Sequence, residues 1–398
     1  MEGQTMANDV VIVSGCRTPI GSFMGSIASV PAQRLGALVI EESIRRANIS
    51  KTDVQEVIMG NVLAAGLGQA PGRQAALFAG LPEGVECLTI NKMCGSGLKA
   101  VMLGAQAIAL GDADVVVAGG MENMSNTPYL LEKAREGFRM GHGKVIDSMI
   151  RDGLWDVYND FHMGNAAEIC AKECSIPREA QDEFAVQSYK RAQESWKEGR
   201  FKAEVVPVIL RGKQGDTTVD QDEEQFKTNF DKIPKLKPAF TPDGTVTAAN
   251  ASKINDGAAA LVLMSAAKAT SLGVKPLAKI VAQASAAKKP EWFTTAPADV
   301  ISKVLGKAKL TVKDIDLFEV NEAFSVVALA VKNLAGIDAA KLNVNGGAVA
   351  LGHPIGASGA RILVTLLNAL QQRTMKRGLA AICIGGGEAS AVIVELMS

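Results

Sequence analysis

The chain has 398 residues, of which 47% are apolar and 21% charged, a balance typical of a globular protein with two or three domains. Lysine and arginine together number 42, as do aspartate and glutamate, so the net charge is zero. This balance excludes a chain-wide basic surface for nucleic acid or an anionic membrane, and we expect neither as a partner.

The six cysteines are scattered rather than spaced like a disulfide framework, so we expect reduced thiols. Cys170 and Cys174 lie one helical turn apart, but no histidine pair is near them, and we expect no metal site. We expect no apolar run of membrane-spanning length, and neither end of the chain resembles a secretory signal, a transit peptide or a peroxisomal address. The sequence therefore favours a cytoplasmic protein.

Short β-rich runs alternate with helical runs from the first residues onward. Residues 10–19 begin with a strand, 33–48 have the periodicity of a helix, and 56–63 read as a strand. The run VVVAGG, residues 115–120, is a fully apolar strand. The alternation predicts an α/β fold with largely buried sheets.

Between these strands, NKMCGSGLKA (91–100) places Cys94 where a loop becomes a helix, with glycine at positions 95 and 97. A helix N-terminus lowers the pKa of a thiol, and glycine lets a substrate approach the backbone. The pattern predicts a nucleophilic cysteine, although a cysteine before a helix is more often a small buried residue.

The chain contains an internal repeat. Three pairs of segments match in the same order at nearly constant spacing: 53–61 with 314–322, the helix from Gly97 with the helix from Gly359, and 113–123 with 379–389. We interpret the chain as two halves of one duplicated unit. Two related sheets packed through shared helices fit this repeat better than one doubly wound sheet.

The last strands of the halves, 259–264 and 390–395, match at a much shorter spacing than the other three pairs. The first half therefore contains extra sequence before its last strand. We interpret it as a lid or loop domain containing an amphipathic helix over 179–199. The predicted units are 1–122, completed by a strand near 256–272, as the first half; 123–255 as the insertion; and 273–398 as the second half.

Loops at corresponding strand ends of the second half carry further reactive side chains. His353 lies in a glycine-rich loop, Cys383 ends a buried strand, and Asn321 ends another. Each has an ordinary structural explanation when taken alone. Because sites of α/β folds collect at strand ends, we expect these groups to join Cys94 in one site for acyl transfer, with two thiols, a base and oxyanion donors.

Together these stretches resemble the thiolase family over essentially the whole chain. The matching motifs are NKMCGSGLKA, GGMENMS, NASKINDGAAA, NEAF, GGAVALGHPIGASGAR and CIGGGEASAV. The resemblance implies a thiolase-like five-layer αβαβα fold of two duplicated βαβαβαββ halves, with a loop domain inserted in the first. This fold agrees with the repeat.

The resemblance also implies a role for each residue of the site. Cys94 would be the acetylated nucleophile, His353 would activate it, and Cys383 would remove the α-proton of acetyl-CoA. One oxyanion hole would be formed by His353 and by Asn321 through a water. The other would be formed by the backbone amides of Cys94 and Gly385.

The stretch FHMGNAAE (161–168) resembles the short-chain group of the family, which acts on acetoacetyl-CoA. The resemblance implies that the acyl end and pantetheine arm contact Leu154, His162, Met163, Phe240, Ala248, Ser252, Ala323 and Phe324. Lys227 is only an approximate match for a residue near the nucleotide of CoA. Lys253 stands where the family usually has glycine, and we expect it to reach the CoA phosphates or to point to solvent.

The implied activity is the reversible conversion of two acetyl-CoA into acetoacetyl-CoA and CoA through an acetyl-cysteine, with no metal or tightly held cofactor. Family members are dimers or tetramers, so a homo-oligomer is expected. The alternative within the family is a 3-ketoacyl-CoA thiolase of broader specificity. A decarboxylating condensing enzyme would need a second histidine in the site, and a non-catalytic acyl-CoA or lipid carrier would be expected to lack a catalytic residue.

Overall fold

The computed structural model describes residues 9–213 and 215–397, and ten strands of this part form one continuous mixed sheet. The first half contains β1 (Val10–Arg17), β2 (Gly21–Ser22), α1 (Ala32–Ala47), β3 (Glu56–Gly60), α2 (Pro71–Phe78), β4 (Glu86–Ile90), α3 (Ser96–Leu110), β5 (Val115–Asn123) and β12 (Asn255–Ser265). After α6 (Ala266–Ser271), the second contains β13 (Ala278–Ala287), α7 (Ala296–Ala308), β14 (Leu317–Val320), α8 (Ser325–Ala335), α9 (Ala348–Leu351), α10 (Ile355–Gln372), β15 (Arg377–Ile384) and β16 (Glu388–Leu396).

The two halves pair their strands in the same way. In the first, β3 runs parallel to β5, and β5, β12 and β1 follow in antiparallel order. In the second, β14 runs parallel to β15, and β15, β16 and β13 follow in antiparallel order. The matching order is the duplication expected from the sequence repeat.

The half-sheets meet at one edge instead of remaining separate. β1 and β13 pair in antiparallel fashion through Val11 with Lys279 and Ile12 with Ala278. This pairing joins the two related half-sheets into one sheet, whereas two sheets linked only by helices were expected. Pairing satisfies backbone groups that would otherwise line two open edges.

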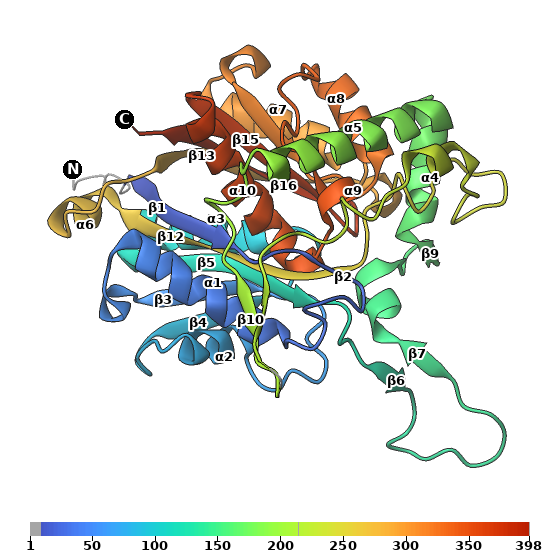
Figure 1. The fold of residues 1–398 in the computed structure, drawn as a ribbon, viewed down its shortest axis with the longest axis horizontal. Coiled ribbons are helices and arrows are strands. Elements are labelled where there is room, and N and C mark those ends of the chain that lie inside the picture. The colour runs from blue at the N-terminus through green and yellow to red at the C-terminus, as the bar shows by residue number, and fades with distance from the viewer. Residues whose placement is uncertain (1–8, 214, 398) are drawn as a thin grey trace, which may run out of the picture.

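Helices cover and separate the half-sheets in an αβαβα order. α3 and α10 contact each other and strands of both halves, and they lie between the half-sheets in Figure 1. α1 and α2 cover the outer face of the first half, while α7 and α8 cover the second. The expected thiolase-like layering is therefore confirmed.

Residues 93–110, which include α3, have the length and composition of a membrane span, with a mean hydropathy of 1.3 over 18 residues. The expectation that no apolar run is long enough is therefore wrong. In this structure 56% of the segment is buried, and α3 packs against β5 and α10. The apolar composition of α3 thus builds the central core.

Glycines allow the two halves to approach at the centre. A Cβ added to Gly97 would lie 2.8 Å from the backbone nitrogen of Ala360, and one on Gly359 would lie 2.4 Å from that of Leu98. These two glycines, which correspond in the repeat, let α3 and α10 cross almost backbone to backbone. The crossing places the starts of both helices, and the loops before them, next to each other.

We expect Gly120→Ala to lower the free energy of unfolding by about 3 kcal/mol or more, since overpacking against rigid backbone is costly. Its Cβ would lie 2.0 Å from the carbonyl oxygen of Gly356, where β5 meets the start of α10. Gly306→Ala in α7 is the control, because nothing lies within 4 Å of the added Cβ. Urea unfolding measures both variants, and equal midpoints for the two would contradict this close approach.

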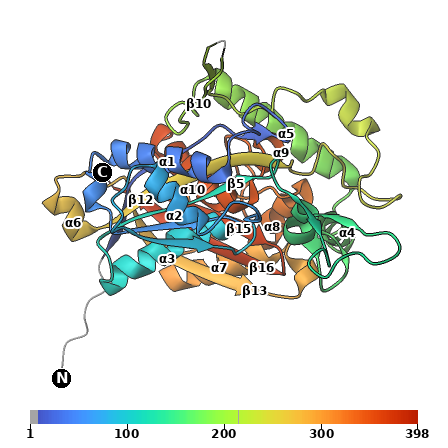
Figure 2. The ribbon, with the colours of Figure 1, turned by 90° about the horizontal axis from the view of Figure 1, so that it is seen from below.

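The insertion contains β6 (Tyr129–Leu131), β7 (Val145–Asp147), β8 (Trp155–Asp156), β9 (Phe161–His162), α4 (Met163–Glu173), α5 (Arg178–Lys197), β10 (Val208–Leu210) and β11 (Thr217–Val219). The amphipathic helix expected over 179–199 is α5, which packs against α8 and α9 of the second half. Figure 2 shows α5 along one side of the molecule, and the β6–β7 hairpin projects from the body in Figure 1. The insertion therefore bridges the halves rather than folding apart from them.

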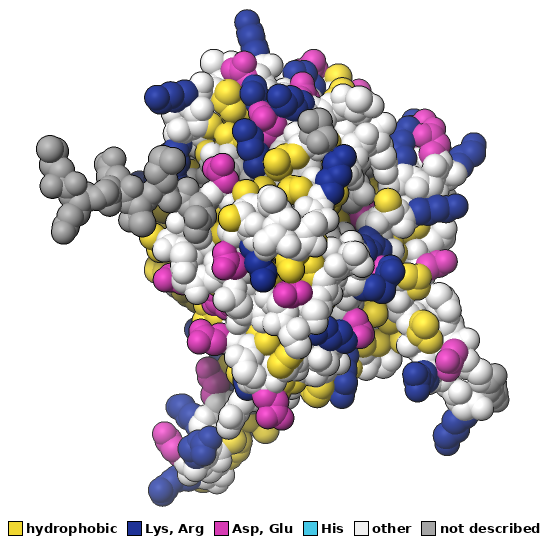
Figure 3. Space-filling model, turned by 90° about the vertical axis from the view of Figure 1, so that its left-hand side faces the viewer, with side chains coloured by type: hydrophobic (Ala, Val, Ile, Leu, Met, Phe, Trp, Pro, Cys, Tyr) yellow, Lys and Arg dark blue, Asp and Glu magenta, His cyan; other side chains and the backbone are white. Residues whose placement is uncertain are grey.

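On the face shown in Figure 3, lysine and arginine side chains are interspersed with aspartate and glutamate side chains. This face carries no large patch of one sign, in keeping with the zero net charge of the sequence.

Candidate active site

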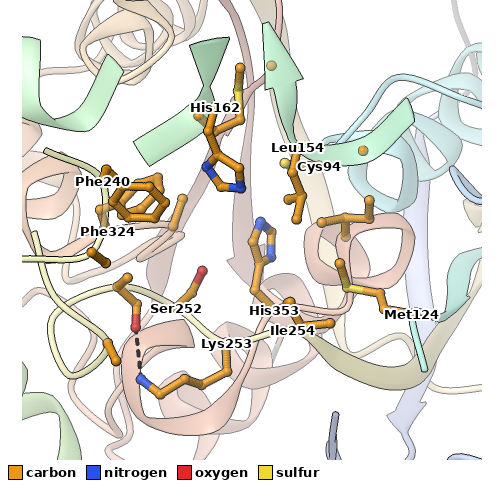
Figure 4. A pocket seen from close by; sticks show the side chains of 18 of the residues that line it. Cys94, Met124, Leu154, His162, Phe240, Ser252, Lys253, Ile254, Phe324 and His353 are labelled. Atoms are coloured by element: carbon orange, nitrogen blue, oxygen red, sulfur yellow. Dashed lines mark hydrogen bonds between the residues drawn. The ribbon is translucent and has the colours of Figure 1, made fainter. Parts of the chain in front are cut away.

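A pocket of about 370 Å³ lies where the insertion meets the loops of both halves. Most residues named from the sequence line it: Cys94, Leu154, His162, Met163, Phe240, Ala248, Ser252, Ala323, Phe324, His353 and Gly385. Figure 4 shows Cys94, His162 and His353 facing one hollow, with Phe240 and Phe324 to one side. The fold therefore gathers groups from positions 94 to 385 into one apolar cavity.

The loop between β4 and α3 holds Cys94 through a tight turn. Met93 has a positive φ of 46°, and the hydroxyl of Ser96 accepts from the backbone N–H of Lys92 at 2.8 Å and donates to the carbonyl of Met93 at 2.6 Å. A Cβ on Gly95 would lie 2.4 Å from the side chain of Ile384. Glycine at 95 therefore admits the opposite half of the protein, rather than a substrate as expected from the sequence.

Burial controls the protonation of Cys94. Removal from water raises the pKa of this thiol to about 11, because the thiolate loses its hydration. The backbone N–H groups of Gly385 and of Cys94 itself partly offset this by favouring the thiolate. The expected lowering of the thiol pKa is therefore wrong, and Cys94 needs a base to lose its proton near neutral pH.

His353 lies in the same pocket as a neutral imidazole. Burial, and then the nearby Arg361 guanidinium, lowers its pKa to about 3. Nδ1 lies 2.6 Å from the hydroxyl of Ser358, and that hydroxyl is 2.9 Å from the carbonyl of Pro354, to which it donates. These two hydrogen bonds make Nδ1 the protonated nitrogen and leave Nε2 with a free lone pair, as a base requires.

We expect the alkylation of Cys94 by iodoacetamide to become about tenfold faster per pH unit from about pH 7 to about pH 9, without a plateau, because only the thiolate reacts and its fraction rises below the pKa. Mass spectrometry of the peptide containing Cys94 measures the rate. Free cysteine, with a pKa of about 8.5, is the reference, and its alkylation rate should level off above that pH. A plateau below about pH 8 would instead reveal a preformed thiolate–imidazolium pair.

Two further groups lie behind the pocket surface. Nδ2 of Asn321 is 3.5 Å from Nε2 of His353. Cys383 is fully buried near the end of β15, and its thiol pKa is raised well above the usual value by burial and then by the charge of Cys94. Neither lines the cavity, but each adjoins a residue that does.

One wall of the pocket is aromatic. The ring of His162 stacks on that of Phe240 with centroids 4.8 Å apart, and Phe240 meets Phe324 edge to face at 6.1 Å. Nδ1 of His162 accepts the backbone N–H of Gly164 at 3.1 Å and so caps α4. These contacts fix a slot beside the thiol.

The two lysines named from the sequence lie in different places. Lys227 does not line the pocket: its ammonium donates to the hydroxyl of Ser22 and is 3.9 Å from Glu223. Lys227 therefore lies outside the cavity that holds the reactive groups, and its contact with the nucleotide of CoA stays a prediction. Lys253 does line the pocket, and its ammonium is tied to Tyr189 and to the carbonyl of Ala251, rather than directed to solvent.

Sequence reasoning missed Ser358, although its place five positions after His353 in the first turn of α10 is a signal that a hydroxyl could reach the ring. It also missed the apolar residues Met124, Ile254 and Ile355 that line the pocket, which carry no chemical signature. Within the described residues, no group of three or more His, Cys, Asp or Glu is placed to hold a metal.

The fold and this pocket define a duplicated α/β protein with a thiol and a neutral imidazole in one apolar cavity. Residues 10–267 match the family described as thiolase, N-terminal domain, and residues 274–396 match thiolase, C-terminal domain. The chain therefore belongs to the thiolase family.

Full-length relatives agree with the family. The chain is 55% identical to acetyl-CoA acetyltransferase 2 of Arabidopsis thaliana, over 98% of this chain and 97% of that protein. It is 55% identical to an acetyl-CoA acetyltransferase of Cupriavidus necator, over 97% of this chain and 99% of that protein. It is 54% identical to the mitochondrial acetyl-CoA acetyltransferase of Rattus norvegicus, over 98% of this chain and 91% of that protein.

Proposed function

We propose that this thiolase is an acetyl-CoA C-acetyltransferase, which interconverts two acetyl-CoA with acetoacetyl-CoA and CoA. The observation that carries the proposal is the shared pocket of Cys94 and His353, with Cys383 directly behind it. The names of relatives 52–55% identical over nearly the whole chain support the same substrate.

In the first half-reaction, Nε2 of His353 takes the proton of the Cys94 thiol, and the sulfur attacks the carbonyl carbon of acetyl-CoA. The tetrahedral oxyanion collapses, the C–S bond to CoA breaks, and the CoA thiolate leaves with the proton of Cys383. The products are acetyl-Cys94, an imidazolium at His353 and a thiolate at Cys383.

In the second half-reaction, the Cys383 thiolate takes an α-proton from a second acetyl-CoA. The resulting carbanion attacks the acetyl group on Cys94, and a new C–C bond forms as the C–S bond breaks. The Cys94 thiolate then recovers its proton from the His353 imidazolium. Two thiols are required because the acetylated sulfur cannot also act as the base.

Each half-reaction places negative charge on a carbonyl oxygen. We assign one oxyanion hole to the backbone N–H groups of Cys94 and Gly385, since both reach the Cys94 sulfur. We assign the other to His353 and Asn321, whose nitrogens lie 3.5 Å apart. The Oδ1 atom of Asn321 is buried without a partner among the described residues, which suits a bound water between this amide and a thioester.

The rate of thiolysis over a series of 3-ketoacyl-CoA chain lengths tests the substrate. We expect a maximum of kcat/KM at acetoacetyl-CoA, because the stacked rings of His162 and Phe240 limit the slot beside the thiol. A maximum at long chains would favour the alternative, a 3-ketoacyl-CoA thiolase of broader specificity.

We also propose a homotetramer in the cytoplasm. Exposed apolar side chains on the β6–β7 hairpin and near β4, including Tyr129, Leu131 and Leu88, support association between copies. The free cysteines fit a reducing compartment. Light scattering of the purified protein and fractionation of the source cells test the two statements, and a monomer or a mitochondrial fraction would overturn them.

A further inference from the structure

The segment 247–254 forms one wall of the pocket, and it ends beside an unusual lysine. Ala248, Ser252 and Lys253 of this segment all line the cavity. Figure 4 shows the Lys253 side chain running along the wall, with a hydrogen bond at its ammonium. The nucleophile, the bases and the oxyanion donors of the site do not include this lysine.

Backbone contacts hold the wall segment on the side of α8. The N–H of Ser252 donates to the carbonyl of Ala323 at 3.0 Å, and the N–H of Ser325 donates to the carbonyl of Asn250 at 2.8 Å. The strand-like bridge between Ala251 and Phe324 continues this pairing. These bonds fix the segment against the second half but leave the side that faces the insertion to side chains.

On the insertion side, Lys253 reaches α5. Its ammonium donates to the hydroxyl of Tyr189 at 2.9 Å and to the carbonyl of Ala251 at 2.9 Å, and it lies 5.6 Å from the centre of the Tyr189 ring. Tyr189 is itself 1% exposed, so its hydroxyl has a fixed position. One charged donor therefore joins the turn of the wall segment to a rigid helix.

We propose that Lys253 is a positioning residue for thioester binding, which fixes the pocket wall at Ser252 and Ala248 by fastening the segment 247–254 to Tyr189. This inference rests on the proposed function, because the occupant of the pocket is taken to be an acyl-CoA. The wall contacts the bound ligand without touching the reacting atoms. Its loosening should weaken ground-state and transition-state binding alike, so KM rises while kcat is kept.

A double-mutant cycle with Tyr189 tests the proposal against direct contact between Lys253 and the CoA phosphates. We expect Lys253→Met and Tyr189→Phe each to raise KM for acetoacetyl-CoA thiolysis about tenfold, with kcat within about threefold of wild type. The KM of the double variant should be no higher than that of the single variant with the higher KM, because both substitutions break the same contact. Lys190→Met, on the exposed side of α5, is the matched loss of a positive charge and should leave KM unchanged.

Chemical rescue adds a second reading. Methylammonium should lower the raised KM of Lys253→Ala by supplying N–H donors, whereas tetramethylammonium, which has none, should not. An unchanged KM in Tyr189→Phe, whatever the KM of Lys253→Met, or additive effects in the double variant, would overturn the proposal. If Lys253→Met fails to fold, Tyr189→Phe alone decides, since it removes a single oxygen. A wild-type protein that does not cleave acetoacetyl-CoA would refute the proposed function instead.

Discussion

We expect Cys94→Ser to lower kcat for acetoacetyl-CoA thiolysis by about 10⁴-fold or more, the range seen when a nucleophile is removed. A hydroxyl is a far weaker nucleophile than a thiol. The site is also built for sulfur, because the N–H groups of Cys94 and Gly385 favour the thiolate and His353 offers a base. Steady-state thiolysis measured by loss of acetoacetyl-CoA absorbance gives the rate.

The matched control is Cys87→Ser, a half-buried thiol on β4 that lies outside the pocket. It should keep full activity within about twofold. Residual activity above about 1% in Cys94→Ser, with Cys87→Ser unchanged, would show that another group carries the acyl chain.

The second large effect is expected for His353→Ala, which should lower kcat/KM by about 10³-fold, within the usual range for loss of a general base. With a thiol pKa of about 11, Cys94 holds its proton at neutral pH unless Nε2 accepts it. The loss should therefore shrink as pH rises toward the thiol pKa, because hydroxide then removes the proton. A pH–rate profile of the variant measures this slope.

His142→Ala, in an exposed loop of the insertion, is the control for removal of a histidine. It should match wild type over the whole pH range. A His353→Ala profile parallel to that of wild type would mean that His353 acts only on substrate carbonyls and that another group deprotonates Cys94.

Much of the fold followed from the sequence because duplication leaves a visible pattern. Segments 53–61 and 314–322, matched in the repeat, became β3 and β14, which hold the same place in their half-sheets. The joining of the halves through β1 and β13 was not predictable, since edge pairing of two strands has no periodicity of its own. The prediction that no apolar run has membrane-spanning length was wrong for α3, because a helix enclosed by two half-sheets can be as apolar as a membrane-spanning helix.

For the site, motif and repeat located the reactive side chains but not their electrostatics. The sequence indicated a lowered thiol pKa from the helix that follows Cys94. The structure places Cys94 before the N-cap, Gly95, in an apolar pocket where desolvation is the largest influence on the thiol pKa. Lys227 was placed by approximate alignment in an irregular loop, where spacing gives no direction to a side chain. Lys253 stood out as a departure from a motif, but only packing could pair it with Tyr189.

The central claim is that Cys94 carries the acetyl group while Cys383 remains free to act as a base. Intact-mass spectrometry after mixing the protein with acetyl-CoA, followed by peptide mapping, tests it most directly. We predict a gain of one acetyl group per chain, on the peptide that contains Cys94, which disappears when CoA is added. An acetyl group on Cys383, or no adduct under conditions where acetoacetyl-CoA is cleaved, would contradict it.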